Sequence, residues 1–313
     1  MVHSTISGRH DLSASGAGSH QRERSVFANS LVAVGYVRCA ADHPSFAIRA
    51  QVAGYRFVFP RRSVLIHATG SRRFVSDASV VEFYNDGDEF TRAVIDPLGD
   101  ETEWYQVGDA DLRDVVREHD PAAADSPRPF RFAHGPTDTR AYALQRALFR
   151  ALAAGRAREH LEVEETVFTV LDRVLARAYE SRRGARVVRI TREERDIADR
   201  ANAVLGRMTS THATLATIAR ATGVSVFHLS RVFRKVTGRT LAKHHLQLRV
   251  LASLTPLGES DLRIEEIATN HGFVGHSHYS SVFRRVFGVA PSTYRTLPAG
   301  PRRHAADIVL GRL

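Results

Sequence analysis

Short apolar segments separated by turn residues fill the first third of the chain. YRFVFP (55–60) and TEWYQVG (102–108) are rich in Val and aromatic residues, and Gly, Pro, Asn and Asp lie between such segments. This pattern is typical of β-strands joined by tight turns. The Asn-Asp-Gly at 85–87 predicts a hairpin, because Gly readily adopts the positive φ that such turns require. We therefore predict a small antiparallel barrel or sandwich over residues 25–108.

Two helical patterns follow, after a proline-containing stretch (109–136) that predicts an irregular connection. The first has apolar residues at helical spacing over 141–152, and the second has a wide apolar stripe over 159–182. Together they predict a helical hairpin over 138–182. We expect the stripe to form the interface of a homodimer. Packing on the sheet of the same chain is the alternative.

Three polar or basic segments are predicted to lie outside the folded domains. Residues 1–24 are rich in Ser, Gly and His and predict a disordered tail. Residues 183–190 predict a basic, exposed linker, and residues 298–313 a second tail. The last domain begins at Thr191, because Thr191 and Glu194 match the N-cap and the third helical position of a capping box.

An internal repeat spans most of the last domain. IARATGVSVFHLSRVFRKVTGRT (218–240) aligns with IATNHGFVGHSHYSSVFRRVFGVA (267–290), and one residue is inserted in the turn of the second copy. Each copy has a short helical pattern ending in Ala-x-x-x-Gly and then a second helical pattern, which together predict a helix-turn-helix. The apolar stretch 241–254 between the copies predicts one long connecting helix.

The second helix of each copy carries polar and basic residues opposite its apolar stripe. Such a helix fits the DNA major groove, where its N-terminal part reaches base edges and its basic residues reach phosphates. If the connecting helix holds the two units about 34 Å apart, they enter successive major grooves on one face of double-stranded DNA. The candidate DNA-binding residues on these faces are Ser230, Arg231, Arg234, Lys235, Ser277, Ser280, Ser281, Arg284 and Arg285.

The distribution of charge agrees with DNA binding. The chain of 313 residues has a formal net charge of +10. Between residues 186 and 300 there are 17 Lys and Arg against 8 Asp and Glu, so nearly the whole excess lies in the predicted helical domain. A basic surface confined to one domain is typical of proteins that bind phosphate groups.

Composition argues against several other classes. No apolar run approaches the ~20 residues of a membrane helix, and the N-terminus lacks the apolar core of a secretory signal, so we expect a cytoplasmic protein with no membrane partner. The single Cys39 excludes an internal disulfide and is expected to be an inert core thiol. His43, His67 and Glu82 lack the His-x-His spacing of a metal site in a β-barrel enzyme. We therefore predict no enzyme, with no catalytic residue, metal or cofactor.

The C-terminal sequence resembles one family closely. GFVGHSHYSSVFRRVFGVAPSTYR (272–295), together with the first copy of the repeat, resembles the DNA-binding domain of the AraC/XylS family of bacterial transcription regulators. The resemblance covers residues 190–297. It implies that DNA bases are read from two sets of positions: Phe227, Ser230 and Arg231 in the first unit, and His276, Ser277, Ser280 and Ser281 in the second.

Three residues depart from the family pattern. His244 and His245 stand where the family usually has Tyr and an apolar residue, which predicts looser or pH-sensitive packing around the first unit. Ser281 stands where many members carry Arg. Arg binds guanine through two hydrogen bonds, whereas Ser can bond to several bases. We therefore expect the second unit to read sequence less strictly.

The resemblance implies an α+β fold of two domains. Residues 25–182 would form a cupin-like β-barrel with a helical hairpin, which binds a small effector and dimerises. Residues 191–297 would form an all-α DNA-binding domain of two helix-turn-helix units joined by a long helix. The arginine pairs at 61–62 and 72–73 could bind an anionic effector, but we expect them on a solvated strand edge.

We therefore expect a sequence-specific transcription regulator that acts on promoter DNA and RNA polymerase and responds to a small molecule. Two alternatives stay open. One is a regulator without an effector, whose N-terminal domain only dimerises or binds a protein partner. The other is a cupin-like enzyme fused to a DNA-binding module. The sequence identifies no effector-binding residue, and it does not separate activation from repression.

Overall fold

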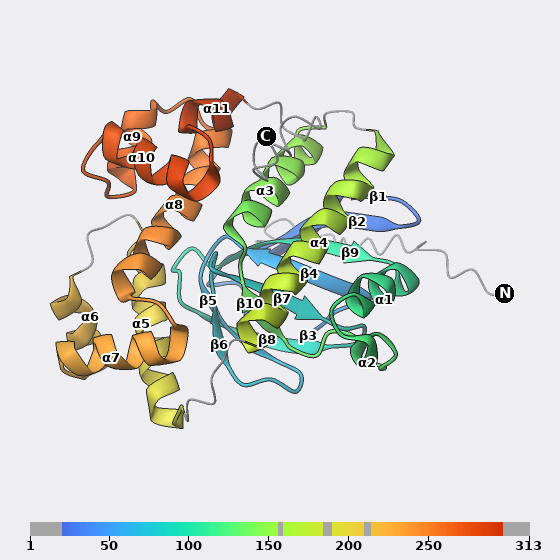
Figure 1. Cartoon of the computed structure of the whole chain (residues 1–313), viewed down its shortest axis with the longest axis horizontal. Helices are drawn as coiled ribbons and strands as arrows, with labels where there is room; N and C mark the ends of the chain where they lie inside the picture. The colour runs from blue at the N-terminus through green and yellow to red at the C-terminus, as the bar shows by residue number, and fades with distance from the viewer. Residues whose placement is uncertain (1–20, 156–158, 184–189, 210–213, 297–313) are drawn as a thin grey trace.

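The computed structural model consists of an N-terminal domain of sheets and helices and a C-terminal domain of helices alone (Figure 1). It describes residues 21–155, 159–183, 190–209 and 214–296. Most of the predicted linker and of the two predicted tails lies outside these residues. The prediction of a tail up to residue 24 was wrong at its end, because β1 (Gln21–Ala28) already pairs with β2 (Val32–Cys39).

Two sheets with antiparallel neighbours make up the β part of the N-terminal domain. The larger has the strand order β1, β2, β9 (Asp100–Val107), β4 (Tyr55–Pro60), β7 (Val80–Tyr84) and β10 (His134–Pro136). The smaller has the order β3 (Ala50–Gln51), β8 (Glu89–Val94), β5 (Val64–Ala68) and β6 (Phe74–Ser76).

Strand β4 shows how the larger sheet serves two cores. Successive side chains of a strand point to opposite faces. Phe57 and Phe59 accordingly join the core under the helices, whereas Val58 joins the core between the two sheets. The larger sheet is therefore a middle layer, with the smaller sheet on one face and helices on the other.

The closed cupin-like barrel that we expected is not what the structure shows. Among the described residues, no strand of one sheet pairs with a strand of the other. Side chains such as Ile66 of the smaller sheet and Trp104 of the larger sheet fill the space between them. The strand-rich region is an open sandwich, the other form that the strand pattern allowed.

The region predicted to be an irregular connection contains regular structure. Helices α1 (Asp109–Arg117) and α2 (Pro121–Ala124) and strand β10 lie within it. Asp120 accepts a hydrogen bond from the backbone N–H of Ala123, and Pro121 occupies the first position of α2. Pro121 begins this short helix, because proline fits the first turn, where its missing N–H is not needed.

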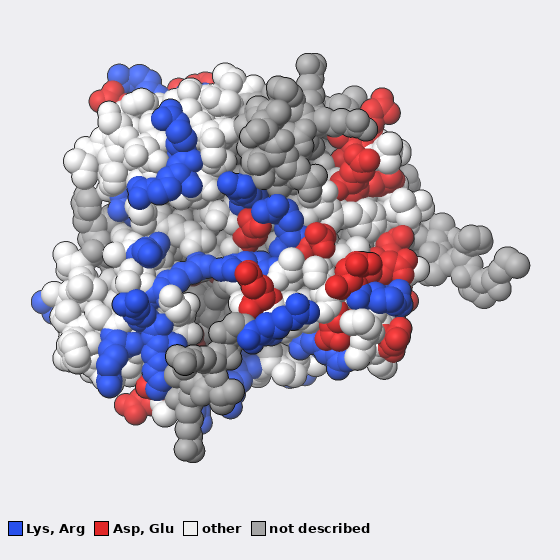
Figure 2. Space-filling model, in the orientation of Figure 1, with Lys and Arg blue, Asp and Glu red and all other residues white. Residues whose placement is uncertain are grey.

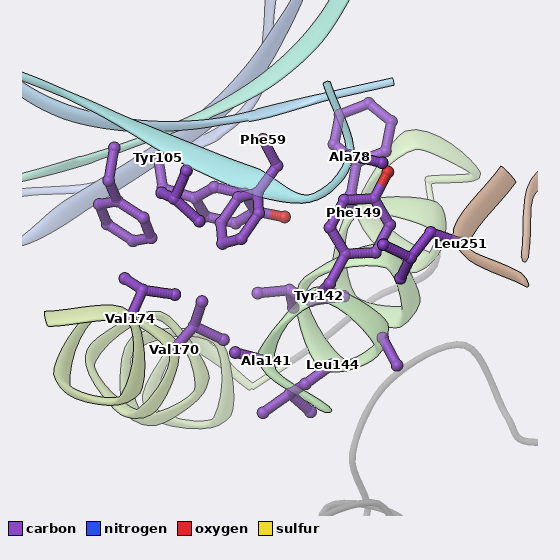
Figure 3. Close-up of a cluster of buried hydrophobic side chains, with 14 of the residues drawn as sticks. Phe59, Ala78, Tyr105, Ala141, Tyr142, Leu144, Phe149, Val170, Val174 and Leu251 are labelled. Carbon is purple, nitrogen blue, oxygen red and sulfur yellow. The ribbon is translucent and has the colours of Figure 1, made fainter. Parts of the chain in front are cut away.

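The predicted helical hairpin forms, but its apolar stripe is not a free dimer interface. It consists of α3 (Thr139–Ala153) and α4 (His160–Arg183). Figure 3 shows Val170 and Val174 of α4 pointing toward Tyr105 of β9, and these side chains are buried in one core. Leu112 of α1 and Ala123 of α2 join the same core, so the helices pack on this face of the sheet in cis.

The C-terminal domain contains the two predicted helix-turn-helix units. Helix α5 (Arg192–Arg207) begins at the predicted capping box of Thr191 and Glu194. The first unit comprises α6 (Leu215–Thr222) and α7 (Val226–Thr237), and the second comprises α9 (Ile264–Asn270) and α10 (His276–Phe287). Helix α8 (Leu241–Glu259) connects them, and α11 (Pro291–Thr296) closes the domain.

Candidate nucleic-acid interface

Tight turns place the second helix of each unit. The backbone of Gly223 has a φ of 72° and that of Gly272 a φ of 66°, a left-handed conformation that side chains rarely tolerate. The first turn then reaches α7 through Ser225, whose hydroxyl accepts the backbone N–H of His228 at 3.2 Å. The second turn is one residue longer and reaches α10 through Gly275. The insertion seen in the sequence therefore lies between the glycine and the helix.

The apolar stripes of α7 and α10 anchor these helices to the domain. Leu229, Val232 and Phe233 of α7 are buried against α5 and α8. Tyr279, Val282 and Phe283 of α10 are buried in the core that also includes α3 and α8. Because one face of each helix is fixed in this way, the opposite faces point away from the protein.

Those opposite faces carry the predicted DNA-binding residues. Phe227 is 80% exposed although it is a large apolar side chain. Ser230 and Ser280 are partly exposed, and the other predicted residues are exposed, namely Arg231, Arg234, Lys235, His276, Ser277, Ser281, Arg284 and Arg285. Figure 2 shows Lys and Arg gathered on the side of the C-terminal helices. Much of the Asp and Glu lies at the opposite side of the same view, over the N-terminal domain.

The basic residues of α7 do not all have free charges. The Nζ of Lys235 contacts both carboxylate oxygens of Glu194 at 2.6 Å. These contacts lower the pKa of Glu194, mainly through the hydrogen bond from Lys235. Within the described part of the chain, Arg234, Arg284 and Arg285 form no ion pair. They are therefore better placed than Lys235 to bind phosphate.

Val274 extends the surface beyond what the sequence predicted. It lies in the turn before α10 and is 87% exposed. Exposed apolar side chains beside a recognition helix can contact the methyl group of thymine, as Phe227 could in the first unit. Apolar residues in turns usually pack inward, so only the observed exposure identifies Val274.

Helix α8 lies between the two helix-turn-helix units along the chain. Its 19 residues span about 28 Å at a rise of 1.5 Å per residue. Helix α7 contacts α8 from the first unit, and α9 and α11 contact it from the second. A helix of this length is of the same order as the ~34 Å of one turn of DNA, which two units in successive major grooves require.

The unusual histidines of α8 are well packed, contrary to the expectation of loose packing. Both side chains are buried. The ring of His244 meets that of Phe233 at a centroid distance of 5.5 Å, and Nε2 of His245 lies 2.9 Å from the carbonyl oxygen of Met208. Burial lowers the pKa of His244, and nearby Asp77 opposes this shift. Sensitivity to pH stays a prediction.

Other predicted features can be placed as well. Cys39 is buried, as expected for a core thiol. In the residues described, no group of three or more His, Cys, Asp or Glu side chains could hold a metal ion. No helix in the described ranges is long and apolar enough to cross a membrane. Arg61 was predicted at a solvated edge, but its side chain is only 8% exposed and pairs with carboxylates of β9 and α8.

Comparisons with known proteins show which family the helical domain is similar to. Residues 218–296 match a family described as a helix-turn-helix domain. Regulatory protein SoxS of Salmonella typhimurium is 38% identical over 78 residues, which are 25% of this chain and 73% of SoxS. The probable transcription factor PqrA of Proteus vulgaris is 32% identical over 88 residues, which are 28% of this chain and 72% of PqrA. A solved AraC-type regulator from Chromobacterium violaceum is 25% identical, with a TM-score of 0.33, over 36% of this chain and 99% of that one.

Proposed function

The chain belongs to the AraC/XylS family of transcription regulators, and we propose that it reads two successive major grooves of one promoter with α7 and α10. It is a DNA-binding protein, and the proposal concerns how it holds DNA. The observation that carries the proposal is the pair of exposed polar faces on two helices whose opposite faces are buried.

Within this function the residues divide by chemistry. Arg231 is the side chain best suited to bind guanine, because a guanidinium donates two parallel hydrogen bonds. Ser277 and Ser281 in the second unit would bond to several bases, and Phe227 and Val274 would contact thymine methyl groups. Arg234, Arg284 and Arg285 would bind phosphates and make affinity depend steeply on salt.

Control by a small molecule is part of the proposal. A cavity of about 290 Å³ lies in the N-terminal domain and is lined by Phe83, Asn85, Arg128, Phe130 and others. The lining combines aromatic side chains with several polar and charged ones, among them Asp88 and Arg131, so the ligand would be a polar small molecule. A panel of metabolites tested by thermal unfolding would identify an effector, since a ligand of the native state raises the unfolding temperature.

Assembly and partners are proposed on the same basis. A regulator of this class acts in the cytoplasm on promoter DNA and contacts RNA polymerase. A homodimer would need a surface other than the buried stripe of α4. Selection of bound duplexes from random DNA, followed by binding of Arg231→Ala to the selected duplex, tests the DNA-reading function directly.

A further inference from the structure

The end of α8 is bound by two arginines of the N-terminal domain. Glu259 is the last residue of α8, Arg61 follows β4, and Arg146 lies in α3. Nη2 of Arg61 lies 3.4 Å from Oε2 of Glu259 and donates to the hydroxyl of Thr255 at 3.0 Å. Nη2 of Arg146 donates to the other oxygen, Oε1, of Glu259.

The same two arginines also bind carboxylates of β9. Nη1 of Arg61 lies 2.8 Å from Oε1 of Glu101, and Nη1 of Arg146 bonds to Glu103. The side chain of Arg61 is 8% exposed and that of Arg146 is 2% exposed. The side chain of Glu259 is 33% exposed, so its loss would leave two buried arginines with the carboxylates of β9 as their partners. We call Arg61, Arg146 and Glu259 the clasp.

The clasp acts on a turn of α8 that has weak internal support. Pro256 lies inside the helix and cannot donate a hydrogen bond to the carbonyl of Ala252, four residues earlier. The last turn of α8, which leads into the second helix-turn-helix unit, therefore depends on contacts made by its side chains.

The N-terminal domain approaches α8 and α5 of the C-terminal domain closely. At the second unit, a Cβ on Gly258 would lie 1.6 Å from Nη1 of Arg150, so α3 reaches the backbone of α8 itself. Figure 3 shows Leu251 of α8 beside Phe149 of α3, and both belong to one buried core. At α5, which packs on the first unit, a Cβ on Gly206 would lie 2.3 Å from the hydroxyl of Ser63.

None of these contacts uses a predicted DNA-reading residue. Those residues stay exposed or partly exposed while the domains are docked. The N-terminal domain therefore does not cover the reading surface. It packs along α8, which connects the two units.

We propose that Arg61, Arg146 and Glu259 are positioning residues for DNA recognition. The clasp fixes the second unit relative to the first, so that the full chain binds two half-sites at one spacing. This inference rests on the proposed function of α7 and α10. It goes beyond that function by assigning the spacing of the two units to the N-terminal domain.

The test uses the full chain and the substitution Glu259→Gln. The matched control is Glu265→Gln, which removes the same charge from an exposed position of α9. The probes are the duplex selected by the wild type, the same duplex with one or two base pairs added between the half-sites, and a duplex with the first half-site alone. Thermal unfolding checks that each variant is folded. If Glu259→Gln does not fold, Glu259→Asp, which keeps the charge, takes its place.

We expect Glu259→Gln to bind the selected duplex about tenfold more weakly and to lose most of the preference for one spacing. Binding to the single half-site and all binding by Glu265→Gln should stay within about twofold of the wild type. An unchanged spacing preference, an equal loss on the single half-site, or tighter binding of the selected duplex would each overturn the proposal.

Hydrogen exchange without DNA separates this proposal from the proposed function. Glu259→Gln should exchange faster in α9 to α11 than the wild type, and equally in α6 and α7. Unchanged exchange in α9 to α11 would show that the clasp does not hold the second unit, whatever the DNA-binding measurements give. If the wild type selects no duplex, the proposed function fails, and the positioning role fails with it even if exchange shows that the clasp holds the second unit.

Discussion

His244 of α8 faces Asp77 of the N-terminal domain, with Nε2 of the ring 3.9 Å from Oδ2 of the carboxylate. Both side chains are buried, and Arg239 and His245 are the other charged or titratable groups that act on His244. The contact joins α8, which packs on α7 of the first helix-turn-helix unit, to the N-terminal domain. A residue that departs from the family pattern therefore lies at the boundary between the domains.

The burial of His244 predicts that the stability of the fold decreases in acid. The pKa of His244 is lowered from 6.5 by burial, so the unfolded chain binds a proton more readily than the folded one as pH falls below 6.5. Stability from this residue is present above that pH and is lost below it. His244→Phe should make the unfolding temperature less dependent on pH between 5 and 7, as measured by thermal melts at each pH. An unchanged slope would show that His244 does not titrate in this range.

Glu82 should give the opposite dependence of stability on pH. It is buried between the sheets, bonded to Ser76 and to the hydroxyl of Tyr84, and burial raises its pKa from 4.5 to about 7. The folded state holds the proton more tightly, so this residue lowers stability as pH rises from 4.5 to 7, by about 3 kcal/mol. Glu82→Gln should remove that decline in denaturant titrations. A decline of the same size in the variant would contradict the assignment.

Arg231 predicts a loss of sequence reading. Arg231→Ala should weaken binding to the selected duplex by about 1–3 kcal/mol and relax the preference at one base pair. Arg192→Ala removes the same charge from a position that is exposed and lies outside the recognition helices, and serves as the control in competition binding. Equal losses of affinity for both variants would show that Arg231 contributes only a nonspecific charge.

Val274 predicts a change in specificity at no cost in stability. Its side chain is almost fully exposed, so Val274→Ser should leave the unfolding temperature within about 2 °C. If Val274 contacts a thymine methyl group, the variant should lose discrimination between thymine and uracil at one position of the duplex. Identical discrimination by the wild type and the variant would exclude the contact.

The C-terminal domain could be predicted from sequence because its signals are local. The apolar stripe of α7 and the glycine at 223 determine the helix-turn-helix within a few turns of chain, and the repeat doubles the signal. The same logic failed for α4. Its stripe has the same periodicity whether it packs on a partner or on its own sheet, and only the apolar face formed by Phe57 and Tyr105 decides between them.

The clasp could not be predicted for a related reason. Arg61 and Glu259 are 198 residues apart in the sequence, and a charged residue at a strand end is usually solvated. Burial of Arg61 depends on the docking of one domain on the other. Val274 was missed because turn residues carry no periodicity that shows which way they point.

Hydroxyl-radical footprinting of the full chain on its selected duplex tests the central claim most directly. Two recognition helices in successive major grooves should protect two tracts on one face of the DNA, about one helical turn or 10 base pairs apart. Arg231→Ala should weaken the tract of the first unit. A single protected tract, or two tracts on opposite faces of the duplex, would contradict the account.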